Sequence, residues 1–160
     1  MIEICRATSI KNPGFIQLLS QFLVQSGAGL PDAAALDIME NAVRMDRIRY
    51  YMALEEGRVV GVVSLTMGFS TFHMKPYAML SDLYVHPGHR GRGVAAALLL
   101  GSMDGAHEAG CYRMVTESYK GMEGIFDRAG WRDGASVMQF TIHLDEAPPS
   151  LTITGSIVFD

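Results

Sequence analysis

The stretch that decides the fold runs Leu80-Ser81-Asp82-Leu83-Tyr84-Val85-His86-Pro87-Gly88-His89-Arg90-Gly91-Arg92-Gly93-Val94-Ala95. It begins as an apolar strand, turns at a proline and a glycine, and enters a largely apolar helix. The first backbone N–H groups of that helix have no intrahelical partners and lie at the positive end of its dipole. Gly91 and Gly93 add no side chain there. Because Arg90 and Arg92 add charged donors, the stretch predicts an anion site that suits a pyrophosphate.

The elements around this stretch predict one mixed sheet. Before it, we expect a strand, two helices and an antiparallel meander of three strands, over Met1 to Ala7, Asn12 to Val24, Pro31 to Asp46, Tyr50 to Leu54, Val59 to Met67 and Tyr77 to Val85. After it, helix, strand, helix and strand follow, over Val94 to Ala109, Tyr112 to Thr116, Gly121 to Ala129 and Val137 to Leu144. The fold class is therefore α/β, an α+β sandwich in which a crossover helix follows the meander and further helices flank the sheet.

Length and composition limit the class of protein. With 160 residues, 49% of them hydrophobic, the chain suits one domain, which we place at residues 1–147, with an extension at 148–160. A net charge of −4 argues against a nucleic-acid partner. Two cysteines are too few for a disulfide framework and suit a reducing compartment, so we expect a cytoplasmic protein. We find no signal peptide and no membrane-spanning run, and expect no membrane partner.

One interpretation of the glycine-rich turn is a nicotinamide dinucleotide site. The run Gly91-Arg92-Gly93-Val94-Ala95-Ala96 matches G-x-G-x-x-G/A, and Glu117 after the next strand could take the place of the ribose-binding acid. In that motif, however, the glycines follow the strand almost at once and lie early in a series of parallel units. Here a meander comes first and His86 to Arg90 intervene. The absence of G-K-[ST] excludes a P-loop.

The same stretch resembles the acyl-CoA signature of the GNAT superfamily of N-acetyltransferases. That signature has the core Q/R-x-x-G-x-G/A, matched by Arg90 to Ala95, after an apolar strand and a His-Pro turn. The resemblance covers about residues 2–144, and Ile125-Phe126-Asp127-Arg128-Ala129-Gly130-Trp131 stands where the family usually has F-Y-x-x-x-G-F. Within the superfamily, Phe69-Ser70-Thr71-Phe72 is similar to the Y-S-T-W of the polyamine and small-amine acetyltransferases.

The resemblance implies acetyl-CoA as cosubstrate and transfer of its acetyl group to a primary amine of a small molecule or peptide. The backbone of Leu83, Tyr84 and Val85 would pair with the pantetheine arm, and an N–H near Leu83 would hold the developing oxyanion. The pyrophosphate would bind at Arg90, Gly91, Arg92, Gly93, Val94 and Ala95.

The sequence departs from the family at two positions that transfer protons. Ser81 stands where the polyamine-type members carry a glutamate, and Phe126 stands where many members carry the tyrosine that protonates the CoA sulfur. The candidate replacements are Tyr119, Glu117 and Asp82. The two departures also suit an alternative function, that of a CoA-binding sensor or interaction protein that catalyses no acetyl transfer. We expect no metal site, because the pair His86 and His89 has no third ligand nearby in the sequence.

The end of the chain predicts a partner surface. After Pro148-Pro149, the run Leu151-Thr152-Ile153-Thr154-Gly155-Ser156-Ile157-Val158 alternates like an edge strand. Such a strand can pair with its own sheet or with that of a second copy, so we expect a homodimer. Light scattering of the whole chain should give about twice the 17.5 kDa of one copy. A mass of one copy at every concentration would contradict the dimer.

Overall fold

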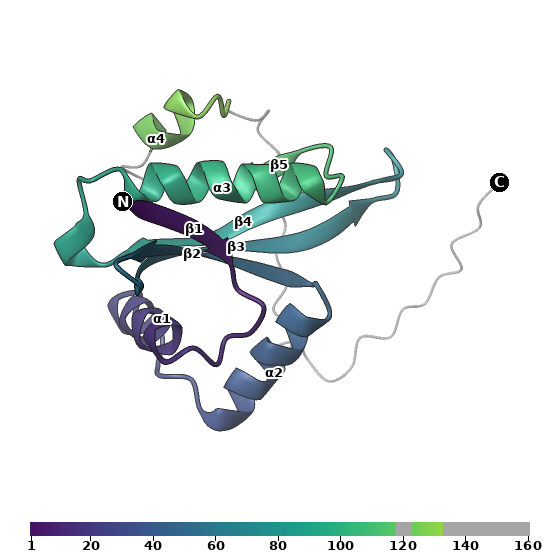
Figure 1. Ribbon diagram of the computed structural model, residues 1–160. Coiled ribbons are helices and arrows are strands. Elements are labelled where there is room, and N and C mark those ends of the chain that lie inside the picture. The colour runs from purple at the N-terminus through teal and green to yellow at the C-terminus, as the bar shows by residue number, and fades with distance from the viewer. Residues whose placement is uncertain (118–122, 133–160) are drawn as a thin grey trace.

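The computed structural model describes residues 1–117 and 123–132. Within these residues, the centre of the fold is a five-stranded sheet with the order β1-β2-β3-β4-β5 (Figure 1). The strands are β1 (Ile2–Arg6), β2 (Ile48–Glu55), β3 (Arg58–Ser70), β4 (Lys75–Val85) and β5 (Met114–Thr116). The first four pair antiparallel, and β5 pairs parallel to β4. The sheet is therefore mixed, with the parallel pair at one edge.

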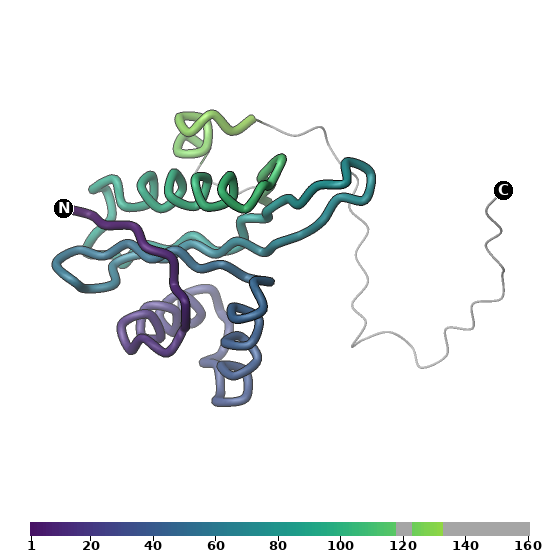
Figure 2. Tube along the Cα trace, turned by 45° about the vertical axis from the view of Figure 1, so that its right-hand side comes forward, coloured from purple at the N-terminus to yellow at the C-terminus, as the bar shows by residue number. Residues whose placement is uncertain are grey.

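Helices cover both faces of this sheet. One face carries α1 (Pro13–Gln25) and α2 (Ala33–Arg44), and the other carries α3 (Val94–Glu108) and α4 (Glu123–Arg128) (Figure 2). The side chains of Asn12 and Asp32 cap α1 and α2 by accepting backbone N–H groups of the first turn. A short 3₁₀ helix, η1 (Pro87–His89), follows β4. No described helix combines the length and the apolar character that crossing a membrane requires.

Each face of the sheet has its own hydrophobic core. Leu83 and Val85 of β4 belong to the core under α3, whereas Tyr84 belongs to the core under α1, where its ring centroid lies 5.4 Å from that of Phe22. Because side chains alternate along a strand, a strand covered on both faces must be apolar at every position. The end of β4 has this pattern. Its packing on both faces therefore fixes the position at which the following loop begins.

Two glycines of α3 let it lie close to the sheet. A Cβ atom at Gly101 would stand 2.6 Å from Cγ2 of Ile4, and a Cβ atom at Gly105 would overlap the ring of Tyr51. Since real Cβ atoms do not approach other atoms this closely, larger residues would push the helix away. The position of α3, and therefore of its N-terminus, depends on these contacts.

The structure confirms the predicted fold class and the order of elements within the described residues. The β3–β4 hairpin is longer than predicted, since β3 continues to Ser70 and β4 begins at Lys75. The strand before α4 is shorter than predicted and comprises Met114–Thr116 alone. The dinucleotide interpretation is wrong, because the glycine-rich turn follows an antiparallel meander rather than a parallel unit. The predicted strand Val137 to Leu144 and the whole extension 148–160 lie outside the described residues.

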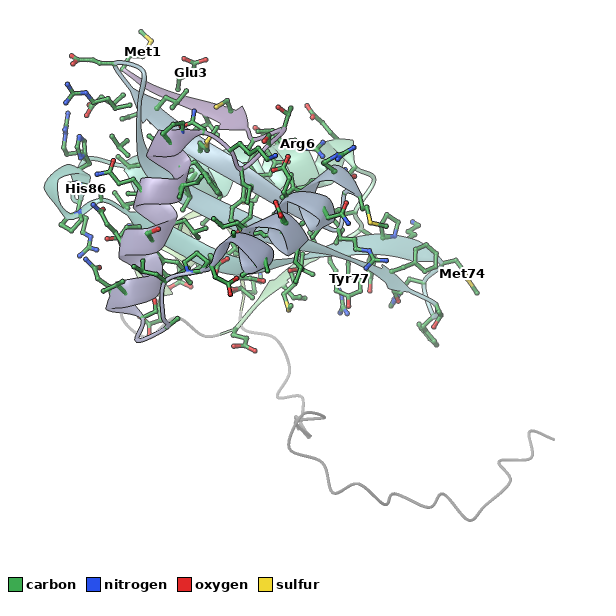
Figure 3. The ribbon with its side chains drawn as sticks, turned by 90° about the horizontal axis from the view of Figure 1, so that it is seen from below. Met1, Glu3, Arg6, Met74, Tyr77 and His86 are labelled. Atoms are coloured by element: carbon green, nitrogen blue, oxygen red, sulfur yellow. The ribbon has the colours of Figure 1, made fainter. Side chains whose placement is uncertain are left out.

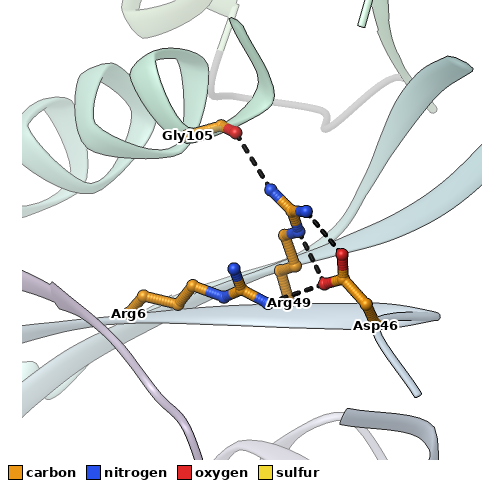
Figure 4. Close-up of polar contacts among 4 residues, drawn as sticks. All are labelled: Arg6, Asp46, Arg49 and Gly105. Atoms are coloured by element: carbon orange, nitrogen blue, oxygen red, sulfur yellow. Dashed lines mark hydrogen bonds and ion pairs between the residues drawn. The ribbon is translucent and has the colours of Figure 1, made fainter. Parts of the chain in front are cut away.

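A charged network at the start of β2 links β1 to α3 (Figure 4). Asp46 accepts hydrogen bonds from Arg49 Nε at 2.8 Å and from Arg6 Nη2 at 2.6 Å. Arg49 also donates to the carbonyl oxygen of Gly105 in α3, at 3.1 Å. The hydrogen bond from Arg49 lowers the pKa of the Asp46 carboxyl most, and the charges of Arg49 and Arg6 add to this against the opposing effect of burial. The network thus ties β1, β2 and α3 together.

Replacing Asp46 with Asn should therefore destabilise the protein in a pH-dependent way. A carboxyl whose pKa is lowered in the folded state stabilises the fold above its ordinary pKa of about 4, and this stabilisation is lost as the pH falls. The side chain of Asp46 is 46% exposed, so we expect Asp46→Asn to reduce the free energy of unfolding by only about 0.5–1 kcal/mol at pH 7. Urea unfolding at pH 7 and pH 3 measures this difference, which should be smaller at pH 3 than at pH 7.

The matched control is Asp37→Asn, which removes an exposed carboxylate from α2. Asn tolerates the left-handed backbone of position 46, where φ is 57°, so the variant changes the charge without adding backbone strain. An equal loss in both variants, or a loss in Asp46→Asn that is as large at pH 3 as at pH 7, would contradict the role of the network.

Candidate functional site

A bulge in β4 separates this strand from β5. Ser64 pairs with Asp82 and Leu65 pairs with Leu80, so Ser81 is an extra residue that bends the strand. Pairing between β4 and β5 covers only Ala78 to Leu80. From Leu83 to Val85, the edge of β4 that faces away from β3 has no strand beside it in the described part of the chain. Among those residues, the backbone groups of this edge are therefore open to a ligand that binds in an extended form.

A cavity of about 520 Å³ lies at this open edge. The end of β4, the following loop, the start of α3 and one side of α4 surround it. Its walls are Leu83, Tyr84, Val85, His89, Arg90, Gly91, Gly93, Val94, Ala95, Ala96, Ile125 and Arg128. The structure thus brings together all but one of the residues that the sequence predicts for cofactor binding, the exception being Arg92.

The loop before α3 has the backbone of an anion site. Gly91 and Gly93 have φ angles of 72° and 81°, in the left-handed region that favours glycine. Gly93 is the N-cap of α3, and no side chain caps the helix there, so its first N–H groups are open to a ligand. A Cβ atom at Gly91 or Gly93 would meet no atom within 4 Å. The backbone conformation, together with the open space, therefore accounts for both glycines.

The two arginines of the loop have different surroundings. Arg90 lines the cavity, where its Nε donates to the carbonyl oxygen of Val85 at 3.0 Å and its guanidinium lies 5.6 Å from the centroid of the Tyr84 ring. Arg92 instead donates two hydrogen bonds to the carboxylate of Glu55, at 2.6 and 3.1 Å. Nε2 of His89 lies 3.2 Å from the same carboxylate. Glu55 therefore holds Arg92 and His89 beside the cavity.

Sequence reasoning missed the contribution of α4 to this cavity. Ile125 and Arg128 lie three residues apart, on one side of a helix, and both line the cavity. The signal in the sequence was the apolar spacing of this helix, which indicates its inner side but not which other element it meets. Arg128 adds a second cation that faces the cavity. His89 and Ala96 are further lining residues that were not predicted.

Asp82 lies on the other face of the sheet, under α1 and α2. The hydroxyl of Ser64, which is 2% exposed, donates to Asp82 Oδ2 at 2.6 Å and accepts the backbone N–H of Asp82 at 3.1 Å. Burial raises the pKa of the Tyr50 hydroxyl, and the charge of Asp82 raises it further. Asp82 is thus a partly buried carboxylate that a neighbouring strand holds in one orientation.

Glu117, Tyr119 and Phe126, the other positions that the sequence links to proton transfer, differ in where they lie. Glu117 is exposed and follows Thr116, the last paired residue of β5, so it lies where β4 and β5 part. Tyr119 lies outside the described residues. Phe126 is 8% exposed and packs edge-on against Trp131, with ring centroids 5.2 Å apart, so it is part of the core. Within residues 1–117 and 123–132, no three His, Cys, Asp or Glu side chains are grouped to hold a metal ion.

Sequence comparison gives one match to a protein family. The model of the acetyltransferase (GNAT) family matches residues 16–131, which is more than half of the chain. No curated protein matches the sequence.

Solved structures share the fold. An integron cassette protein from the mobile metagenome of Cole Harbour Salt Marsh is 26% identical, with a TM-score of 0.75 and 91% of each chain covered. An aminoglycoside acetyltransferase from an uncultured soil sample, in complex with sisomicin, is 19% identical, with a TM-score of 0.71 over 89% of this chain and 97% of that one. A predicted acetyltransferase with acetyl-CoA, from Clostridium acetobutylicum, is 15% identical, with a TM-score of 0.70 over 88% and 96% of the two chains.

Proposed function

The chain belongs to the acetyltransferase (GNAT) family, and we propose that it transfers the acetyl group of acetyl-CoA to a primary amine of a small molecule or a peptide. The observation that carries this proposal is the open edge of β4, which leads into a cavity that ends at the uncapped N-terminus of α3. An extended arm with an anionic end matches that combination of backbone edge and helix terminus.

The residues at the cavity fit acetyl-CoA, which supplies the thioester whose acetyl group is transferred. In the proposal, the backbone of Leu83, Tyr84 and Val85 pairs with the pantetheine arm, and an N–H near Leu83 polarises the thioester carbonyl. The segment from Arg90 to Ala95 holds the pyrophosphate, together with Arg128. Arg92 contributes after exchanging Glu55 for a phosphate oxygen, because its side chain is 53% exposed, and Glu55, which is 16% exposed, keeps His89 beside it at 3.2 Å.

Proton transfer falls to residues other than Ser81 and Phe126. We assign Asp82 as the group that draws the proton from the amine, through water, because it is the candidate carboxylate whose orientation a buried hydroxyl fixes. Glu117 is the alternative, and its exposure gives it no such fixed orientation. Tyr119 is the proposed donor of a proton to the departing thiolate.

We propose an amine acceptor, a cytoplasmic location and a homodimer. The similar structure with sisomicin is that of an aminoglycoside acetyltransferase, which supports an amine acceptor as the class to test first. The likeness of residues 69–72 to polyamine acetyltransferases adds polyamines to the panel. Cys5 and Cys111 are free thiols, which suits the proposed cytoplasmic location. The homodimer remains a prediction, because its proposed strand lies outside the described residues.

The direct test of the function is an acetyl-transfer assay. The protein is incubated with acetyl-CoA and, separately, with polyamines, aminoglycosides, amino acids and peptides, while release of free thiol is followed. We expect thiol release that depends on at least one amine and gives the acetylated amine in equal amount. Binding of acetyl-CoA without release of thiol by any amine would favour the sensor instead.

Reversing the charges of the loop should weaken cosubstrate binding. Arg90→Glu combined with Arg92→Glu turns two attractive contacts with phosphate into repulsive ones, so we expect CoA to bind about 3 kcal/mol more weakly, roughly a hundredfold. Calorimetry with CoA measures this change. Because Arg92 is paired with Glu55, Arg90→Glu alone should account for more than half of it. Arg44→Glu, on the exposed side of α2, is the control. Unchanged affinity in the double variant would refute the assignment of the loop.

The proton acceptor can be identified by comparing two carboxylates. With a confirmed amine, Asp82→Asn should lower kcat by about 10- to 100-fold with little change in CoA affinity, because the group acts in the transition state. Glu117→Gln is the matched control and should change kcat less than threefold. A larger effect of Glu117→Gln than of Asp82→Asn would transfer the role to Glu117.

The proton donor is tested with the same amine. Tyr119→Phe should lower kcat by about 10- to 100-fold, because this group also acts in the transition state. Turnover in Tyr119→Phe equal to that of the wild type would indicate that water protonates the departing thiolate.

A further inference from the structure

A second cavity, of about 440 Å³, lies on the α1 side of the loop that joins β4 and α3. Its walls include Gln17 and Gln21 of α1, Arg58 at the start of β3, and the two histidines of the loop, His86 and His89. Figure 3, which views the α1 face, shows the segment with His86 beside α1. The proposed acetyl transfer uses none of the α1 residues of this cavity. A volume of this size suits a small ligand.

The ionisable side chains that line the cavity are one arginine and two histidines. Arg58 and both histidines contribute to the walls, and no described acidic residue does. Glu55, which lies near His89, is engaged by Arg92. Arg58, by contrast, has no side-chain hydrogen bond or ion pair within the described residues. The cavity therefore presents an uncompensated positive charge, which favours an anion.

The side-chain oxygen of Gln21 adds a second requirement for a ligand of this cavity. Oε1 of Gln21 is inaccessible to solvent and has no hydrogen-bond partner within the described residues. Buried polar atoms in folded proteins are nearly always hydrogen-bonded, so this acceptor calls for a donor from the cavity. Asn12 also lines the cavity, where its side-chain oxygen caps α1 by accepting the N–H groups of Gly14 and Phe15, and it makes no hydrogen bond to this atom. A ligand with an N–H or O–H group would satisfy Gln21.

We propose that this cavity binds a compact anion that also carries a hydrogen-bond donor, such as hydrogen phosphate or an α-amino acid. The negative charge faces Arg58 and His86, since His89 already lies beside Glu55, and the donor group faces Gln21. The site is separate from the acetyl-CoA cavity, which lies on the opposite face of the sheet, although His89 lines both.

Calorimetry on the full chain with saturating CoA tests the proposal, because CoA blocks the other cavity. Inorganic phosphate and glycine are titrated separately, and the one that binds identifies the source of the anion. We expect one site for at least one of them. Arg58→Gln and Gln21→Leu should each weaken that binding at least tenfold. Arg44→Gln removes an exposed arginine of α2 and Arg128→Gln removes the arginine of α4 that lines the acetyl-CoA cavity, so neither should change it.

Three results would overturn the proposal. The first is that neither phosphate nor glycine binds. The second is binding that saturating CoA abolishes, or that Arg128→Gln weakens while Arg58→Gln does not, since the anion would then lie in the acetyl-CoA cavity. The third is an equal loss in Arg44→Gln and Arg58→Gln, which would indicate attraction to net charge alone. Arg58 is exposed, so Arg58→Gln keeps the test valid even if Gln21→Leu disturbs the packing of α1.

Discussion

One extra residue in β4 determines where this strand leaves β5. The bulge at Ser81 bends β4 immediately after Leu80, the last residue that pairs with β5. Without it, pairing could continue to the end of β4, and the strand would have no open edge for a ligand. The cavity beside Leu83 to Val85 and the access to the N-terminus of α3 both follow from this separation. In this protein, the open edge of β4 thus depends on a local irregularity of that strand.

The loop after β4 combines a fixed backbone with exchangeable charges. Packing of β4 on both faces fixes where the loop begins, and the close contact of α3 with β1 and β2 fixes where it ends. Between these points, Glu55 holds Arg92 through an ion pair in which the arginine side chain is 53% exposed. The Glu55 side chain is only 16% exposed, but it lies 3.2 Å from His89 as well, and a phosphate would offer Arg92 charge-assisted hydrogen bonds in place of those it makes with Glu55. Glu55 therefore keeps Arg92 near the cavity without preventing it from binding a ligand.

The sequence predicts local features of this protein better than those that join distant segments. The meander and the first three helices follow from periodicity and turn residues that lie within one segment, and the structure confirms them. The glycine-rich turn before α3 was predictable for the same reason. The pairing of Arg92 with Glu55 and the presence of Arg128 at the cavity were not, because each joins elements far apart in the chain. Their geometry depends on strand register and helix placement, which one sequence does not specify.

The bulge also places Asp82 on the same face of the sheet as Ser81, the position where the resemblance to polyamine acetyltransferases implies a glutamate. Successive residues of a regular strand point to opposite faces, so a carboxylate one position further along would normally face the wrong side. Here the hydroxyls of Ser81 and Thr66 lie 3.3 Å apart, and Asp82 accepts a hydrogen bond from Ser64. Ser64 and Thr66 are two residues apart on β3 and therefore share a face. The bulge thus brings Ser81 and Asp82 to one face of the sheet, and this shared face is the reason why the proposed proton acceptor is Asp82.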